Sequence, residues 1–171
     1  RDRHVRSRRQ RQMCIRDSLY SALGAQVSGI ARSTGLRDGY NVVATEEKDE
    51  LLARTDVLVM ILPSVEATEK ALDAEVLRTL PERAYVVNAG RGSTVDEDAL
   101  IQALEDHEIA GAAIDVASQE PLGSDSPLWD APNLIITPHS AGGRPVDSED
   151  LIEHNLRALR GEGEYRNAMN A

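Results

Sequence analysis

Three apolar runs decide the fold: Ala84-Tyr85-Val86-Val87, Ile109-Ala110-Gly111-Ala112-Ala113-Ile114 and Leu134-Ile135-Ile136. They have the length and composition of short β-strands. A polar residue follows each run: Arg91 after the first, Glu120 (by way of Asp115) after the second, and His139 after the third. Ligands of an open parallel sheet bind outside the carboxyl ends of its strands. The stretch therefore predicts a reaction centre made of a cation, an acid and an imidazole.

The rest of the chain alternates between expected strands and helices. Residues 57–62 are apolar throughout, which is typical of a parallel strand buried on both faces. Two shorter strands are expected within 25–31 and 42–44. Expected helices, with candidate caps, are 46–54 (Thr45), 74–80 (Asp73), 98–106 (a capping box of Thr94 and Glu97) and about 146–160. This alternation predicts an α/β fold with a doubly wound parallel sheet.

Composition narrows the class of protein. The chain has 171 residues, 41% of them apolar, with no phenylalanine, so its core must be aliphatic. No apolar run approaches the roughly 20 residues that span a membrane. Cys14 is the single cysteine, so no internal disulfide can form, and we expect a cytoplasmic protein. We expect no membrane partner and no metal site.

The net charge of −10 is unevenly distributed. Residues 1–18 hold seven arginines and two aspartates, a net of +5, which leaves −15 on the remainder. An acidic body argues against nucleic-acid binding. It favours solubility, or adaptation to high salt. The basic arm 1–18 could contact nucleic acid, but we favour a non-native or disordered segment. We expect a partial dinucleotide-binding domain over 19–145 and a C-terminal helix and tail over 146–171.

From about Leu19 onward the sequence resembles the D-isomer-specific 2-hydroxyacid dehydrogenases, especially the glyoxylate/hydroxypyruvate reductases. Five motifs in order carry the resemblance: Asn88-Ala89-Gly90-Arg91-Gly92-Ser93-Thr94-Val95-Asp96-Glu97, Gly111-Ala112-Ala113-Ile114-Asp115-Val116, Glu120-Pro121-Leu122, Ser126-Pro127-Leu128-Trp129 and Thr137-Pro138-His139-Ser140-Ala141-Gly142. The resemblance implies a Rossmann-like fold. It also implies a homodimer in the full-length protein.

The resemblance places Arg91, Glu120 and His139 in the active site. It implies reduction of a small 2-oxo acid to the D-2-hydroxy acid. Physical chemistry supports these roles. Hydride transfer builds charge on the carbonyl oxygen, and histidine can donate the compensating proton near neutral pH. A carboxylate beside the histidine favours and orients the imidazolium. A guanidinium binds a substrate carboxylate through two parallel hydrogen bonds.

The resemblance also implies where a dinucleotide cofactor lies. The nicotinamide side would be lined by Ala89, Gly90, Arg91, Asp115, His139, Ser140, Ala141 and Gly142, and the ribose region by Leu62, Pro63 and Thr68. NAD-preferring relatives carry an acid at the end of the strand that follows the glycine-rich loop. At this place the chain has Arg32 and Ser33. That pair suits the 2′-phosphate of NADP. NAD stays the alternative, with Arg32 stacked on adenine.

One departure from the family pattern limits these expectations. The first strand and its Gly-x-Gly-x-x-Gly turn should lie just before Leu19, yet residues 1–23 contain no glycine. We therefore expect an incomplete sheet and only the C-terminal portion of an enzyme. Two alternatives remain: a dinucleotide-sensing, corepressor-like interaction protein, and an inert truncated product. The sequence does not choose between glyoxylate, hydroxypyruvate and other small 2-oxo acids.

Overall fold

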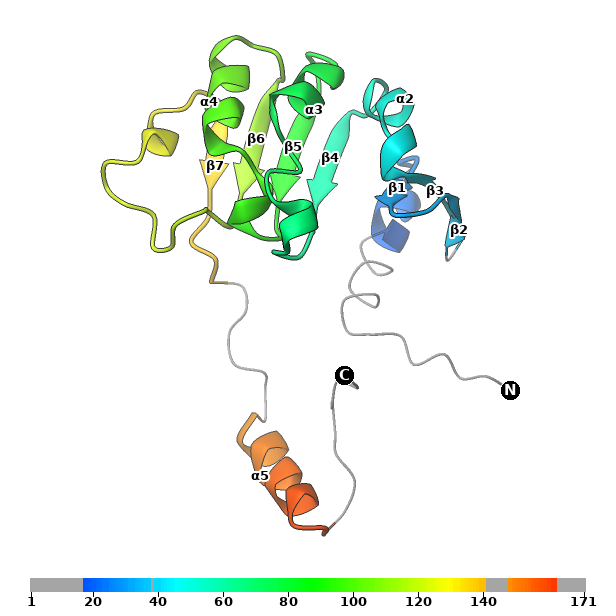
Figure 1. The fold of residues 1–171 in the computed structure, drawn as a ribbon, viewed down its shortest axis with the longest axis vertical. Coiled ribbons are helices and arrows are strands. Elements are labelled where there is room, and N and C mark those ends of the chain that lie inside the picture. Colours follow the sequence, from blue (N-terminus) through cyan, green and yellow to red (C-terminus); the bar gives the residue numbers. More distant parts are fainter. Residues whose placement is uncertain (1–16, 38, 141–147, 163–171) are drawn as a thin grey trace. The chain divides into compact units, whose positions relative to one another are not determined.

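The computed structural model of the chain describes residues 17–37, 39–140 and 148–162 (Figure 1). Ser28–Ser140 form one compact unit, which contains both sheets and most of the expected site residues. The described stretches 17–27 and 148–162 belong to a second unit. The basic arm, apart from its last two residues, lies outside the described residues, and the expected domain boundaries stay a prediction.

The larger sheet is parallel and has the strand order β4-β5-β6-β7. Its strands are β4 (Val57–Met60), β5 (Tyr85–Asn88), β6 (Gly111–Ile114) and β7 (Leu134–Ile136). All four expected strands are present, and each is shorter than or equal to the apolar run that predicted it. The ladder places Asn88 level with Ile114, and Ile114 level with Ile136. The fold is therefore α/β with a parallel sheet, as the sequence predicts.

Two helices cover one face of this sheet and enclose the core. These are α3 (Ala74–Thr79) and α4 (Glu97–Glu105), which lie over the same face in Figure 1. The core between them and the sheet is aliphatic: Met60, Val76, Leu77, Val86, Leu100, Ala103, Leu104, Ala112 and Ile114, closed at one end by Leu128. Truncating one such leucine to alanine typically costs 2–5 kcal/mol.

The opposite face of the sheet is apolar and carries exposed side chains. Val57 and Tyr85 are each 53% exposed, and Ile135 is 65% exposed. Alternate residues of β4 follow this pattern, since Met60 is buried whereas Val57 is not. The expectation that 57–62 is buried on both faces is therefore wrong for the described unit. A run of apolar residues indicates that both faces of a strand can be buried. The elements that pack against the sheet determine which of the two faces is buried.

A second, smaller sheet precedes the larger one in the chain. In it, β1 (Ser28–Ala31) pairs in parallel with β3 (Tyr40–Ala44), which also pairs antiparallel with β2 (Gly35–Arg37). Strands β1 and β3 were expected, but β2 was not. All three β2 residues are exposed, and they show no apolar alternation that would have indicated a strand.

The segment between β3 and β4 differs from the single helix expected there. It forms a 3₁₀ turn over Thr45–Glu47 and then a short helix, α2 (Asp49–Leu52). The Thr45 hydroxyl donates to the carbonyl oxygen of Ala31 at 3.2 Å and does not cap a helix. A side chain that ties β3 to β1 is unavailable for the helix, so the expected cap at Thr45 is wrong.

The two caps of the core helices had different outcomes. Asp73 accepts hydrogen bonds from the backbone amides of Glu75 and Val76, so it is the expected N-cap of α3. The capping box of Thr94 and Glu97 is wrong. Asp96 is the N-cap of α4 and accepts from the Ala99 amide.

The second unit contains two described helices. The first covers residues 17–22 and is followed by Gly24, whose φ of +87° is that of a glycine in a left-handed cap. The second is α5 (Ser148–Leu159), close to the helix expected over 146–160. None of the helices in the described ranges is long and apolar enough to cross a membrane.

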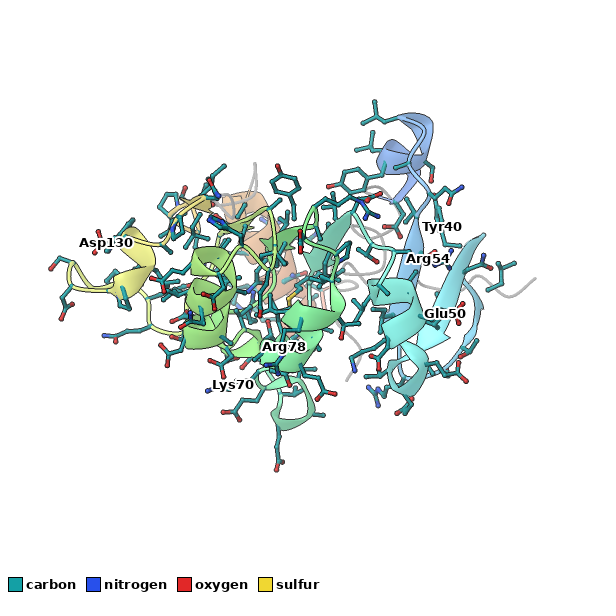
Figure 2. The ribbon with its side chains drawn as sticks, turned by 90° about the horizontal axis from the view of Figure 1, so that it is seen from above. Tyr40, Glu50, Arg54, Lys70, Arg78 and Asp130 are labelled. Carbon is teal, nitrogen blue, oxygen red and sulfur yellow. The ribbon has the colours of Figure 1, made fainter. Side chains whose placement is uncertain are left out.

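An ion pair at the start of α4 generates a prediction about acid stability. The Lys70 ammonium lies 2.9 Å from the Asp96 carboxylate (Lys70 is labelled in Figure 2). This hydrogen bond lowers the pKa of Asp96 below its ordinary value of 3.8. A lowered folded-state pKa gives stability that is present above the unfolded-state pKa and is lost as the pH falls through the folded-state pKa.

We predict that Asp96→Asn destabilises the chain by roughly 0.2–1 kcal/mol near neutral pH. Asparagine keeps the cap but loses the ion pair. The difference from the parent should shrink as the pH falls through the lowered folded-state pKa of Asp96, because the protonated carboxyl no longer pairs with Lys70. Urea unfolding at neutral pH and at a series of acidic pH values measures it, with Lys70→Met as the matched variant. A destabilisation that stays constant with pH would contradict the ion-pair explanation.

Candidate functional site

The connections that carry Arg91, Asp115 and His139 leave the parallel strands at one edge of the sheet. Backbone hydrogen bonds continue one step beyond the strands: the Asp115 amide donates to Asn88 at 2.9 Å and the Thr137 amide donates to Ile114 at 2.9 Å. The residues that leave β5, β6 and β7 therefore start from the same level. The sequence predicted this convergence from the apolar runs alone.

The turn after β5 is held by two buried polar side chains. Asn88 donates to the Arg91 carbonyl at 3.1 Å and accepts from the Gly90 amide at 3.0 Å. The Thr94 hydroxyl donates to the same Arg91 carbonyl at 2.6 Å. Sequence reasoning assigned no role to Asn88, and it assigned Thr94 to a capping box instead of to this turn. Together they fix the backbone that presents the exposed Arg91 side chain, whose guanidinium donates to the carbonyl of Gly90 at 2.7 Å.

Gly90 fits this turn because the end of β4 comes very close. A Cβ atom at Gly90 would lie 2.9 Å from both the backbone nitrogen and the carbonyl oxygen of Leu62. No side chain can be accommodated there without moving the backbone. Gly90 and Leu62, both expected to line the cofactor site, are therefore in direct backbone contact.

Glu120 and His139 form a hydrogen-bonded pair. The Nδ1 atom of His139 lies 2.8 Å from Oε2 of Glu120, and the other carboxylate oxygen accepts from the Ala117 amide at 3.1 Å. The side chains are 41% (Glu120) and 44% (His139) exposed. The hydrogen bond from His139 is the largest cause that lowers the pKa of Glu120, followed by that from Ala117; the positive charge of Arg91 contributes as well. Both other expected catalytic residues therefore favour the charged form of Glu120.

Asp115 holds the turn that carries His139. Its Oδ1 atom accepts from the Thr137 hydroxyl at 2.5 Å and from the His139 amide at 3.2 Å. His139 has a φ of +50°, in the left-handed region that few non-glycine residues adopt. The carboxylate therefore stabilises an unusual backbone conformation. Asp115 was expected to line the nicotinamide side, and here it contacts the loop that presents the imidazole.

A pair of arginines flanks Ser33 after β1. Arg32 and Ser33 are exposed, as a binding site for a phosphate requires. Arg37 of β2 reaches back and donates to the Ser33 hydroxyl at 2.9 Å and to its carbonyl at 3.2 Å. Sequence reasoning missed Arg37, because its approach depends on the hairpin formed by the unpredicted strand β2.

The remaining expected cofactor residues are placed as follows. The Thr68 hydroxyl donates to the Pro63 carbonyl at 2.5 Å and lies 3.2 Å from the Val65 amide, so it is engaged within its own turn. Ala89 and Ser140 are exposed near the strand ends. Ala141 and Gly142 lie outside the described residues. No group of three or more His, Cys, Asp or Glu residues within the described ranges is placed to hold a metal ion.

Comparison with known proteins identifies the family. The sequence-family model for the NAD binding domain of D-isomer specific 2-hydroxyacid dehydrogenases matches residues 17–141. The chain belongs to the D-isomer specific 2-hydroxyacid dehydrogenase family. Within this family the chain is 41% identical over 118 residues to glyoxylate/hydroxypyruvate reductase A of Salmonella paratyphi B. That match covers 68% of the chain and 38% of the relative, so the chain spans about two fifths of that relative's length.

Solved structures of family members have the same fold. A family protein from Klebsiella pneumoniae 342 is 38% identical with a TM-score of 0.78, covering 90% of this chain and 50% of that one. The NADPH-dependent glyoxylate/hydroxypyruvate reductase of Sinorhizobium meliloti is 28% identical with a TM-score of 0.78, covering 90% and 60%. A Xanthobacter autotrophicus Py2 dehydrogenase, solved with NADPH and MES, is 33% identical with a TM-score of 0.75, covering 90% and 64%.

The Glu120–His139 pair generates a prediction about titration. Because the hydrogen bond from His139 is the main cause of the lowered Glu120 pKa, we predict that His139→Ala raises this pKa towards the ordinary glutamate value of about 4.3. Carboxyl-carbon NMR of the labelled chain measures the titration. His107→Ala, on another loop, is the control. An unchanged Glu120 titration in His139→Ala would show that the two side chains do not interact in solution.

Proposed function

We propose that the protein reduces a small 2-oxo acid, such as glyoxylate or hydroxypyruvate, to the D-2-hydroxy acid with NADPH. The single observation that carries the proposal is the Glu120–His139 hydrogen bond of 2.8 Å at the edge where Arg91 also lies. An acid, an imidazole and a guanidinium are the groups that this reaction needs. An intact trio favours an enzyme over a corepressor-like interaction protein.

His139 supplies the proton in this proposal. Its Nδ1 atom faces Glu120, which leaves Nε2 as the ring nitrogen that can face a substrate. The carbonyl oxygen of the 2-oxo acid takes the Nε2 proton as the carbon accepts a hydride, and Glu120 stabilises the imidazolium before the transfer. General acid catalysis of this kind contributes roughly 10²–10⁴-fold. In the reverse direction the neutral imidazole takes the proton back.

Arg91 binds the substrate carboxylate in this proposal. Its only described side-chain hydrogen bond goes to the carbonyl of Gly90, which leaves other guanidinium donors for an anion. A planar guanidinium can hold a carboxylate through two hydrogen bonds and so fix the orientation of the neighbouring carbonyl. This would place the 2-oxo carbon beside His139.

The residues present fit a nicotinamide dinucleotide at two places. Ala89 and Ser140 are exposed near the strand ends, and the corner of Arg32, Ser33 and Arg37 offers two cations and a hydroxyl. When bound, the dinucleotide supplies the hydride. Two arginines around a serine match a 2′-phosphate better than a ribose hydroxyl, which supports NADPH over NADH.

We further propose that the activity belongs to a longer, cytoplasmic, homodimeric protein and that the 171-residue chain alone is inactive. Residues 1–23 contain no glycine, whereas the pyrophosphate of a dinucleotide is usually held by a glycine-rich turn at a helix N-terminus. The chain also spans only 38% of the Salmonella relative. The greater part of that relative therefore has no counterpart in the matched region.

A chimera tests the proposed activity. Residues 1–18 are replaced by the corresponding N-terminal portion of the Salmonella reductase, and NADPH absorbance is followed with glyoxylate and hydroxypyruvate. We predict turnover by the chimera, none by the unmodified chain, and a loss of roughly 10²–10⁴-fold on His139→Ala. The His107→Ala chimera is the control. A folded chimera without turnover, or one insensitive to His139→Ala, would contradict the proposed function.

The cofactor preference has its own test in the same chimera. We predict that Arg32→Asp reverses a preference for NADPH over NADH, because the new carboxylate repels a 2′-phosphate and can accept from ribose hydroxyls. Arg37→Ala should weaken NADPH binding and leave NADH binding unchanged. Arg78→Asp, an exposed arginine on α3, makes the same charge change elsewhere (Figure 2). Equal affinity of the parent for both cofactors would contradict this assignment.

A further inference from the structure

Glu97, in the first turn of α4, contacts the loop that carries Glu120. Its two carboxylate oxygens accept hydrogen bonds from Ser118, one from the backbone amide at 2.6 Å and one from the hydroxyl at 2.7 Å. Both distances are those of strong, charge-assisted hydrogen bonds. Glu97 therefore links the first turn of α4 to the loop that follows β6.

Gly92 supports the same peptide from the other side of the contact. A Cβ atom at Gly92 would lie 1.9 Å from both the carbonyl carbon and the oxygen of Ala117, and 2.4 Å from the nitrogen of Ser118. These distances are far inside van der Waals contact, so the Ala117–Ser118 peptide rests directly on the Gly92 backbone. The peptide is held by the hydrogen bond of its amide to Glu97, by a second hydrogen bond from the Ser118 hydroxyl, and by close packing.

Ala117, which contributes the carbonyl of this peptide, contacts the candidate catalytic pair through its own backbone amide. The Ala117 amide donates to Oε1 of Glu120 at 3.1 Å, and Oε2 of Glu120 binds Nδ1 of His139 at 2.8 Å. The line of contacts runs from Glu97 through the loop to Glu120 and then to the imidazole. The Glu120 side chain is 41% exposed, and its hydrogen bonds with Ala117 and His139 are the contacts that orient it.

We propose that Glu97 is a positioning residue that sets the geometry of the Glu120–His139 pair by holding the Ala117–Ser118 peptide against Gly92. This inference rests on the proposed function for its catalytic meaning. Groups that orient a reacting residue through hydrogen bonds affect activity much as direct contacts do. A misplacement of about 1 Å can cost about 10²-fold in rate.

The test compares three variants of the 171-residue chain by carboxyl-carbon NMR titration of Glu120. Glu97→Ala removes both hydrogen bonds. Glu97→Gln keeps a side chain that can accept from the Ser118 amide and donate to its hydroxyl. Asp98→Ala removes an exposed acid from the same first turn of α4 and so controls for the interaction with the helix dipole.

We expect the Glu120 pKa to rise in Glu97→Ala towards the ordinary value of about 4.3, and to stay near the parent value in Glu97→Gln and Asp98→Ala. An electrostatic role would give a different pattern. Both Glu97 variants remove a negative charge, which by itself lowers the pKa of a neighbouring carboxyl. A rise in the alanine variant alone, with rescue by glutamine, is specific to positioning.

Two further measurements keep the test decisive. Ser118→Ala loses only the hydroxyl hydrogen bond and should raise the Glu120 pKa by less than Glu97→Ala does. It takes the place of Glu97→Ala in the test if that variant fails to fold. Amide exchange at Ser118 should be faster in Glu97→Ala than in the parent. Folded variants with an unchanged Glu120 titration and unchanged Ser118 exchange would overturn the inference. Neither readout requires turnover, so the proposed function can fail in the chimera while this inference stands, or the reverse.

Discussion

The parallel register of β5, β6 and β7 is the constraint on which the candidate site depends. It places Asn88, Ile114 and Ile136 level with one another, so that the three connections leave the sheet together. The core beneath fixes this register, because slipping a strand by one residue would turn its buried side chains away from α3 and α4. The buried residues Leu100 and Leu104 therefore act on the site at a distance, through the strands on which they pack.

The strands fix where the connecting loops begin, and contacts within the loops orient the candidate catalytic side chains. Asp115 holds the His139 amide although the φ of +50° at His139 is one that costs roughly 1–3 kcal/mol in a non-glycine residue. Glu97 holds the Ser118 amide in a comparable way. In both cases an acid accepts from the backbone close to a candidate catalytic side chain. Asp115 was expected to line the nicotinamide side and Glu97 to complete a capping box, but both carboxylates support the loops that carry the candidate catalytic residues.

How far the sequence predicts this structure depends on how local each signal is. Apolar runs predicted the strands, and Asp73 predicted a helix start, because both signals act within a few residues. The capping box failed because the Thr94 hydroxyl binds Arg91 and the Glu97 carboxylate binds Ser118, the latter a partner 21 positions away. Strand β2, and with it the approach of Arg37 to Ser33, depends on pairing with β3 and has no apolar pattern of its own.

The exposure of the Glu120–His139 pair to water limits the catalysis that the described unit can support. Glu120 and His139 are each more than two fifths exposed. In water a pair of opposite charges at about 4 Å gains only about 1 kcal/mol, against several times that in a water-excluded site. Positioning of reactants can account for about 7–11 kcal/mol of a barrier, and it requires the substrate to be enclosed. In the proposed mechanism the unit presents the groups that move the proton, whereas enclosure must come from surface beyond them. That is the physical reason for proposing that turnover belongs to a longer protein.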